Sequence, residues 1–108
     1  MQVWHRILPQ VDSFAEQSVM GWGNRGWVEI IEMILEICEM GALKTHIMYK
    51  CNLNSKQITQ YLQFLQDRKL IDLIRKPPTS KRPSFITTEI GKKYIYVYKQ
   101  LENIFKND

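Results

Sequence analysis

The stretch KTHIMYKCNLNSKQITQYLQFLQDRKLI, residues 44–71, decides the fold that this sequence predicts. Its first part predicts a short helix with apolar residues on one side, which the turn Asn52-Leu53-Asn54 ends. Residues 55–68 then repeat apolar side chains at helical spacing, and Ser55 stands where an N-cap belongs. The apolar positions are Ile47, Met48 and Cys51 in the first helix and Ile58, Tyr61, Leu62 and Leu65 in the second. Two short helices around a tight turn are the pattern of a helix-turn-helix.

The side of the second helix that faces away from its apolar residues is polar and nearly uncharged. It carries Lys56, Thr59, Gln60 and Gln63. Amides, a hydroxyl and an ammonium group can bond to base edges and phosphates without the burial of a carboxylate. An ordinary solvated face would more often carry pairs of Glu and Lys. The pattern favours a recognition helix that enters the major groove of DNA, and a plain polar surface helix is the alternative.

A β-hairpin is predicted directly after this helix. Residues 70–76 read as one strand, residues 77–83 contain three prolines that cannot continue it, and residues 84–87 resume an extended run. Its basic side chains are Arg75 and Lys76 at the base and Lys81 and Arg82 at the tip. Behind a helix pair, such a hairpin is interpreted as a wing whose cations meet backbone phosphates. A solvated surface loop is the alternative.

Positive charge is concentrated in the region of the helix pair and the wing. Residues 41–99 hold 12 Lys and Arg against 3 Asp and Glu, a balance of +9, whereas residues 1–40 hold 2 against 6, a balance of −4. A surface that binds a polyanion requires such an asymmetry. A membrane surface is the competing polyanion, but no segment has the apolar length of a spanning helix. The predicted DNA-binding residues are Lys44, Thr45, His46, Lys50, Ser55, Lys56, Thr59, Gln60, Gln63, Arg75, Lys76, Lys81 and Arg82.

Metal and catalytic chemistry find little support in the sequence. The two cysteines, Cys38 and Cys51, fall on apolar helix faces without the paired spacing of a zinc site, so buried thiols and no metal are expected. No glycine-rich phosphate loop is present, and no nucleophile stands beside a His and an acid. We therefore expect no catalytic residue and no cofactor. Because no secretory signal pattern opens the chain, a reducing cytoplasmic location with association to the nucleoid is expected.

Two further helices flank this region. The apolar spacing from Trp27 to Met40 predicts a scaffold helix with one apolar face, and Gly41 stands where it would end this helix. Its acidic residues are expected to form a stripe that faces solvent, away from nucleic acid. They are Glu29, Glu32, Glu36 and Glu39.

The last helix is predicted from Thr88, its cap, to Phe105. One apolar line has the a/d spacing of a coiled-coil seam and a second line runs beside it. One line can pack on the domain and the other on a second subunit, which predicts a homodimer. The predicted dimer interface is Ile90, Tyr94, Val97, Tyr98, Leu101, Ile104 and Phe105, with Ile95 on the second line. A monomer that folds both lines onto itself is the alternative, because the segment covers little more than two heptads.

The predicted organisation has three parts. Residues 1–26 are predicted to form an N-terminal extension, partly flexible, with a short helix from about Val11 to Met20. Residues 27–88 form the winged helix-turn-helix domain. Residues 89–108 form the C-terminal dimerisation helix. At 108 residues, one domain with a modest core is expected.

Several strings in this order resemble one protein family. They are EIIEMILE at 29–36, KTHIMYKCNLN at 44–54, YLQFLQDRKLI at 61–71 and Thr88-Glu89-Ile90-Gly91. Over roughly residues 25–105 the chain resembles the small archaeal winged-helix DNA-binding proteins of the ten-kilodalton chromatin-associated family. The last helix, which ends soon after Phe105, and the N-terminal extension depart from that pattern.

The resemblance implies an α+β fold, a winged helix-turn-helix with a C-terminal dimerisation helix. It also implies homodimers joined by an antiparallel coiled coil and binding of duplex DNA with little or modest sequence preference. The expected function is therefore that of a transcriptional regulator or chromatin component. The alternative is a winged-helix module for protein–protein interaction in a larger assembly.

Overall fold

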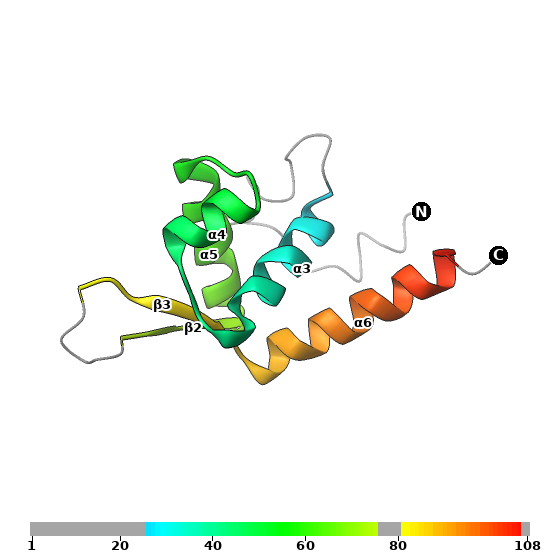
Figure 1. Cartoon of the computed structure of the whole chain (residues 1–108). Coiled ribbons are helices and arrows are strands. Elements are labelled where there is room, and N and C mark those ends of the chain that lie inside the picture. The colour runs from blue at the N-terminus through cyan, green and yellow to red at the C-terminus, as the bar shows by residue number, and fades with distance from the viewer. Residues whose placement is uncertain (1–25, 76–80, 107–108) are drawn as a thin grey trace.

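The computed structural model describes residues 26–75 and 81–106. In chain order the elements are α3 (Trp27–Ile37), the 3-10 helix η1 (Cys38–Met40), β1 (Ala42–Leu43), α4 (Lys44–Lys50), α5 (Ser55–Asp67), β2 (Ile71–Ile74), β3 (Ser84–Thr87) and α6 (Glu89–Lys106). Figure 1 shows α3, α4 and α5 packed together, with the β2–β3 hairpin and α6 extending in opposite directions from them. This arrangement confirms the predicted α+β winged helix-turn-helix with a long C-terminal helix. The helix predicted near residues 11–20 lies outside the described residues.

The sheet has three antiparallel strands in the order β1-β3-β2. Phe85 in the central strand is paired with Ala42 of β1 on one side and with Leu73 of β2 on the other. Strand β3 coincides with the predicted run, and β2 is shorter than predicted because it ends at Ile74. Strand β1 was not predicted. Two residues are too few to show an alternating pattern, so this strand exists only through its distant partner.

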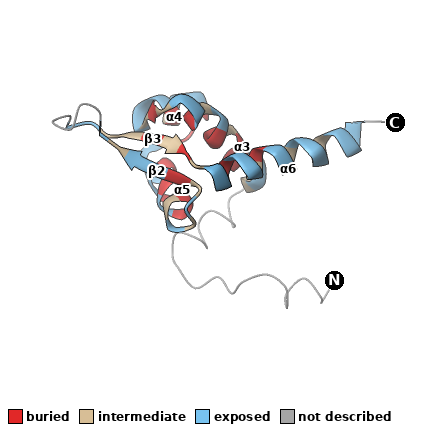
Figure 2. Cartoon of the chain, turned by 90° about the horizontal axis from the view of Figure 1, so that it is seen from below, coloured by how far each residue is buried: buried red, intermediate tan, exposed pale blue. Residues whose placement is uncertain are grey.

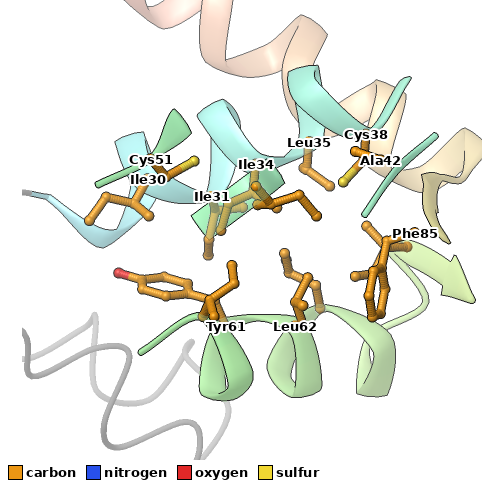
Figure 3. Close-up of a cluster of buried hydrophobic side chains, with 14 of the residues drawn as sticks. Ile30, Ile31, Ile34, Leu35, Cys38, Ala42, Cys51, Tyr61, Leu62 and Phe85 are labelled. Atoms are coloured by element: carbon orange, nitrogen blue, oxygen red, sulfur yellow. The ribbon is translucent and has the colours of Figure 1, made fainter. Parts of the chain in front are cut away.

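The core lies between α3, α5 and the central strand. Ile31, Ile34 and Leu35 of α3 face Tyr61 and Leu62 of α5, and Phe85 of β3 closes one end of the cluster (Figure 3). All of these side chains are buried. Each fully buried aliphatic side chain contributes roughly 1.5–3 kcal/mol to folding, so this cluster holds the three elements together.

The first helix ends where the sequence predicts, but its acidic stripe is interrupted. The α-helix gives way to the 3-10 turn η1, and Gly41 follows with φ +88°, a conformation that favours glycine. The expectation that all four glutamates face solvent is wrong for Glu32, which is only 6% exposed. Helix α6 packs along α3 and covers it, which no pattern within α3 could reveal.

The turn between α4 and α5 uses a different cap from the one predicted. Asn52 adopts φ +54°, which Asn tolerates better than most residues. The N-cap of α5 is Asn54, not Ser55: the Asn54 side chain accepts a hydrogen bond from the Gln57 amide N at 2.7 Å. Gln57 Oε1 accepts one from the Asn54 amide at 3.0 Å. This capping box satisfies two amides instead of one, and the helix begins at Ser55, one residue earlier than a cap at Ser55 would place it.

Two threonines, Thr87 and Thr88, fix the position at which α6 begins. Thr88 caps the helix as predicted, because its Oγ1 accepts a hydrogen bond from the Gly91 amide at 3.1 Å. The same hydroxyl donates to the Lys69 carbonyl at 2.6 Å, and the neighbouring Thr87 hydroxyl donates to the Leu35 carbonyl at 2.6 Å. Two adjacent threonines therefore join α6 to the ends of α3 and α5.

Candidate nucleic-acid interface

The outward side of α5 carries three of the four predicted recognition residues. Lys56, Thr59 and Gln63 are exposed. Gln60 is only 9% exposed, so the prediction that it lies on the outer face is wrong. Phe64, one turn further along the same side, is buried as well, and the buried face of α5 is therefore wider than the apolar spacing indicated.

The exposed polar groups of α5 make hydrogen bonds within the helix. Thr59 Oγ1 donates to the Ser55 carbonyl at 2.8 Å, and Gln63 Nε2 donates to Asp67 Oδ1 at 2.8 Å. Asp67 is exposed and was not among the predicted site residues. Its spacing of four residues from Gln63 is the signal that could have found it.

The predicted residues of α4 are all exposed. Lys44, Thr45, His46 and Lys50 project from the same short helix. Tyr49 is 78% exposed beside them and is not among the residues that the sequence predicts. An exposed tyrosine ring on a basic helix can stack on a base or a sugar, so Tyr49 is a further candidate contact.

A groove joins the start of α4 to the base of the wing. It has a volume of about 220 Å³, and its lining residues are Leu43, Lys44, Thr45, Lys81, Arg82, Pro83 and Phe85. Pairing of Leu43 with Ser84 brings the two segments together, although they are about 40 residues apart in sequence. One predicted cation from the helix pair, Lys44, and two from the hairpin, Lys81 and Arg82, thus share one concave surface.

The rest of the wing is basic as predicted. Arg75, directly after β2, is exposed, as are Lys81 and Arg82. Because Ser84 at the start of β3 pairs with Ile74, Lys81 and Arg82 lie near the base of the hairpin, whereas they were predicted at its tip. Lys76 lies outside the described residues. Asp72 is an exposed acid on β2.

A second polar cluster lies where α6 packs on α3. Lys99 Nζ lies 3.4 Å from Glu36 Oε2, and the Tyr94 hydroxyl donates to the Val28 carbonyl at 2.8 Å. Burial, together with a hydrogen bond to Glu36, raises the pKa of Glu32 to about 7. The hydrogen bond from Glu32 lowers the pKa of Glu36. These contacts fix α6 to the body over its first three turns.

The predicted dimer residues of α6 divide into two groups. Tyr94 and Tyr98 are half-buried against the body, and Ile95 of the second line is buried. The remaining five are exposed on the single chain: Ile90, Val97, Leu101, Ile104 and Phe105. Figure 2 shows that the part of α6 beyond α3 is exposed.

Other kinds of site are poorly represented in the described part of the chain. Both cysteines are buried, and burial raises the pKa of the Cys38 thiol to about 12. Within residues 26–75 and 81–106, no group of three or more His, Cys, Asp or Glu side chains is arranged to hold a metal ion. No helix in the same ranges combines the length and the hydropathy needed to cross a bilayer.

Solved structures with the same fold include several DNA-binding proteins. The chain is similar to Sso10a-2, a DNA-binding protein from Sulfolobus solfataricus, at 25% identity and a TM-score of 0.67, over 77% of this chain and 84% of that one. It also resembles a mutant of S. aureus MepR bound to an oligodeoxyribonucleotide, at 15% identity and a TM-score of 0.62, over 73% of this chain and 57% of that one.

Lactococcus lactis ZitR in complex with DNA has a TM-score of 0.51 at 17% identity, over 77% of this chain and 64% of that one. At these identities, the likeness to MepR and ZitR concerns the fold alone. A search of curated protein sequences finds no match. The family profile described as "Winged helix-turn-helix" matches residues 24–106, more than three quarters of the sequence. The chain therefore belongs to the winged helix-turn-helix family.

Proposed function

We propose that this protein binds duplex DNA, as a transcriptional regulator or chromatin component, with α5 in the major groove and the wing on the backbone. The observation that carries the proposal is the groove in which Lys44, Lys81 and Arg82 meet. Cations that come from separate elements and converge on one concave surface suit a continuous polyanion better than a small ligand. The likeness in fold to Sso10a-2, at 25% identity, adds support.

In this proposal the residues have two kinds of role. Lys56, Thr59 and Gln63 of α5 reach base edges, because they are exposed and carry hydrogen-bonding groups. Phosphate contacts carry no sequence information but set the register of the protein on the duplex. They come from the exposed polar residues of α4, the start of α5 and the wing: Lys44, Thr45, His46, Lys50, Ser55, Arg75, Lys81 and Arg82.

Helix α6 is proposed to join two copies of the chain. Val97 and Leu101 are 55% and 47% exposed, and with Ile90 and Ile104 they follow the a/d spacing of a coiled coil. Apolar side chains in one continuous line on a helix are stabilised by a partner that presents the same line. A two-fold dimer would place two recognition helices on one duplex. Residues 27–88 then act as the reading domain and residues 89–108 as the dimerisation helix, in a protein associated with the nucleoid.

Fluorescence anisotropy with labelled duplexes of random sequence tests DNA binding. If about six cations neutralise phosphates, the logarithm of the association constant should fall with the logarithm of salt concentration at a slope of about −5. Replacement of Lys81 and Arg82 together by Ala should weaken binding to all sequences alike. The control, Lys92→Ala with Lys93→Ala, removes two exposed charges from α6 and should leave affinity nearly unchanged. Binding that does not depend on salt would contradict the proposal.

Light scattering after size exclusion tests the dimer. Wild-type protein should show twice the chain mass of 12.9 kDa, and Val97→Glu with Leu101→Glu should show the chain mass itself. Tyr96→Glu is the control, since Tyr96 is 66% exposed on another side of the same helix. A wild-type protein that stays monomeric at 100 µM would exclude this assembly.

A module for protein–protein interaction is the second candidate function. The observation in its favour is the exposed apolar line of α6, which a different protein could cover. A gel shift with random duplexes at low salt separates the two. No shift at micromolar protein would favour the interaction module.

A further inference from the structure

Two of the outward polar side chains of α5 each use a donor hydrogen within the helix in the free protein. Thr59 gives its hydroxyl hydrogen to the Ser55 carbonyl, and Gln63 gives an amide hydrogen to the carboxylate of Asp67. At the beginning of the helix, it is the side-chain oxygens of Asn54 and Gln57 that are occupied, because they accept from backbone amides in the capping box. The polar groups that this helix offers to a partner therefore include two acceptors, Thr59 Oγ1 and Gln63 Oε1.

The orientation of the Gln63 amide is set by Asp67. An ionised carboxylate only accepts hydrogen bonds, so the NH₂ end of the amide must face it, and a flipped amide would bring Oε1 against a negative charge. The bond is 2.8 Å long and spans one helical turn, where the two side chains are neighbours. Gln63 Oε1 thus remains available as an acceptor, together with one amide hydrogen.

We infer that Gln63 determines base specificity and selects adenine or cytosine over guanine and thymine at one base pair. Asp67 is its positioning residue, because it fixes the orientation of the Gln63 amide. The inference rests on the proposed binding of duplex DNA by α5. In the major groove, adenine presents an amino donor beside an acceptor and cytosine presents an amino donor. Guanine presents two acceptors, which need two donors, and thymine presents an acceptor and a methyl group.

Because Asp67 is negatively charged, its removal should change overall affinity for DNA and base preference in different ways. A carboxylate on the helix that enters the groove repels the phosphates, so its removal should raise affinity for DNA in general. The same removal frees the amide of Gln63 to rotate, so preference at one base pair should be lost. If Asp67 only supported the helix, its removal would lower affinity and leave the preference unchanged.

Selection of binding sites from random duplexes at physiological salt tests the inference in the full-length protein. The wild type should enrich adenine or cytosine at one position in each half-site, about 5- to 150-fold, the range expected of one good side chain–base contact. Gln63→Ala should lose this enrichment. Asp67→Ala should lose it too, with affinity for random duplexes equal to or above that of the wild type.

Two variants separate orientation from charge. Asp67→Asn removes the charge but keeps an oxygen that can accept from Gln63, so the preference should be largely retained. Asp72→Ala removes an exposed acid from β2 and should keep the preference in full. Circular dichroism of each variant verifies that the fold is intact.

The outcomes distinguish this inference from the proposed function. Enrichment that survives in Asp67→Ala, or a wild type that selects guanine or no base at all, would overturn the inference while DNA binding stands. A wild type that binds no duplex would overturn the proposed function itself.

Discussion

The carboxyl group of Glu32 is hydrogen-bonded to that of Glu36, one turn further along α3, in a seam that α6 closes. Two carboxylates cannot share a hydrogen bond unless one of them keeps a proton. Glu32 is the one that keeps it, because it is buried, whereas Glu36 is exposed and paired with Lys99. The contact between the body and α6 therefore includes a group that titrates near neutral pH.

Stability should fall as pH rises from 5 to 8. The folded pKa of Glu32 is about 7, above its ordinary value of 4.5, so its contribution is complete below 4.5 and is lost as pH passes 7. The lowered pKa of Glu36 acts in the opposite sense, but only below its ordinary value of 4.5, outside this window. We expect a loss on the order of 2 kcal/mol in the free energy of unfolding.

Urea denaturation at several pH values and one protein concentration measures this loss. Glu32→Gln should flatten the dependence between pH 5 and pH 8, and it should be more stable than the wild type at pH 8. Glu39→Gln, at an exposed position of η1, should keep the wild-type slope. A Glu32→Gln protein with an unchanged slope would assign the dependence to other groups.

Gly91→Ala should destabilise the fold although alanine is the better helix former. A Cβ at this position would meet the Leu70 carbonyl oxygen and Thr87 Cγ2 at distances that real Cβ atoms do not show, so the first turn of α6 must move. We expect a cost of about 1–3 kcal/mol, as for overpacking. Gly26→Ala is the matched control, because nothing lies within 4 Å of a Cβ there. Equal unfolding midpoints for the two variants would show that the close contact relaxes freely.

Asn54→Ala should cost about 1 kcal/mol of stability, since it removes the side chain that caps α5. Ser55→Ala should be nearly neutral, because Ser55 is exposed at the first position of the helix and is not the cap. Thermal unfolding followed by circular dichroism compares the two variants directly. The reverse order of stability would restore Ser55 as the cap.

Lys44→Ala should reduce the steepness of the salt dependence of DNA binding by about 0.9, the contribution of one phosphate contact on a duplex. Lys44 lines the groove between α4 and the wing, where it shares a concave surface with Lys81 and Arg82. Affinity should fall equally for all sequences, as measured by anisotropy between 50 and 200 mM salt. Lys93→Ala, on the exposed side of α6, should leave the slope as it is. An unaltered slope in Lys44→Ala would remove the groove from the interface.

Local patterns were sufficient for most elements of the fold. The two helices of the helix-turn-helix, the strand at 84–87 and the Thr88 cap each depend on hydrogen bonds or periodicities that span only a few residues. The cap of α5 was predicted one residue away from its true position. Asn54 is followed three residues later by Gln57, a capping-box spacing that could have identified it.

Local patterns in the sequence could not predict which polar side chains are buried or which distant segments pair. Glu32 and Gln60 occupy helix positions that look polar and solvent-facing, and both are buried in the folded chain. The number of neighbours around a side chain depends on elements far away in sequence, such as α6 over α3. Periodicity within one helix reports only which residues share a face, and it does not report how wide the buried part of that face is.

The order of the elements, their boundaries within a few residues and the basic character of residues 41–99 were determined by the sequence alone, because each is a property of neighbouring residues. Only the tertiary structure decided that β1 pairs with β3 and so brings Lys44 to the wing. Only the tertiary structure decided, too, that burial beside α6 raises the pKa of Glu32 to about 7. Both depend on contacts between segments at least 40 residues apart. The free energy of such contacts cannot be inferred from the pattern of residues within one helix or strand.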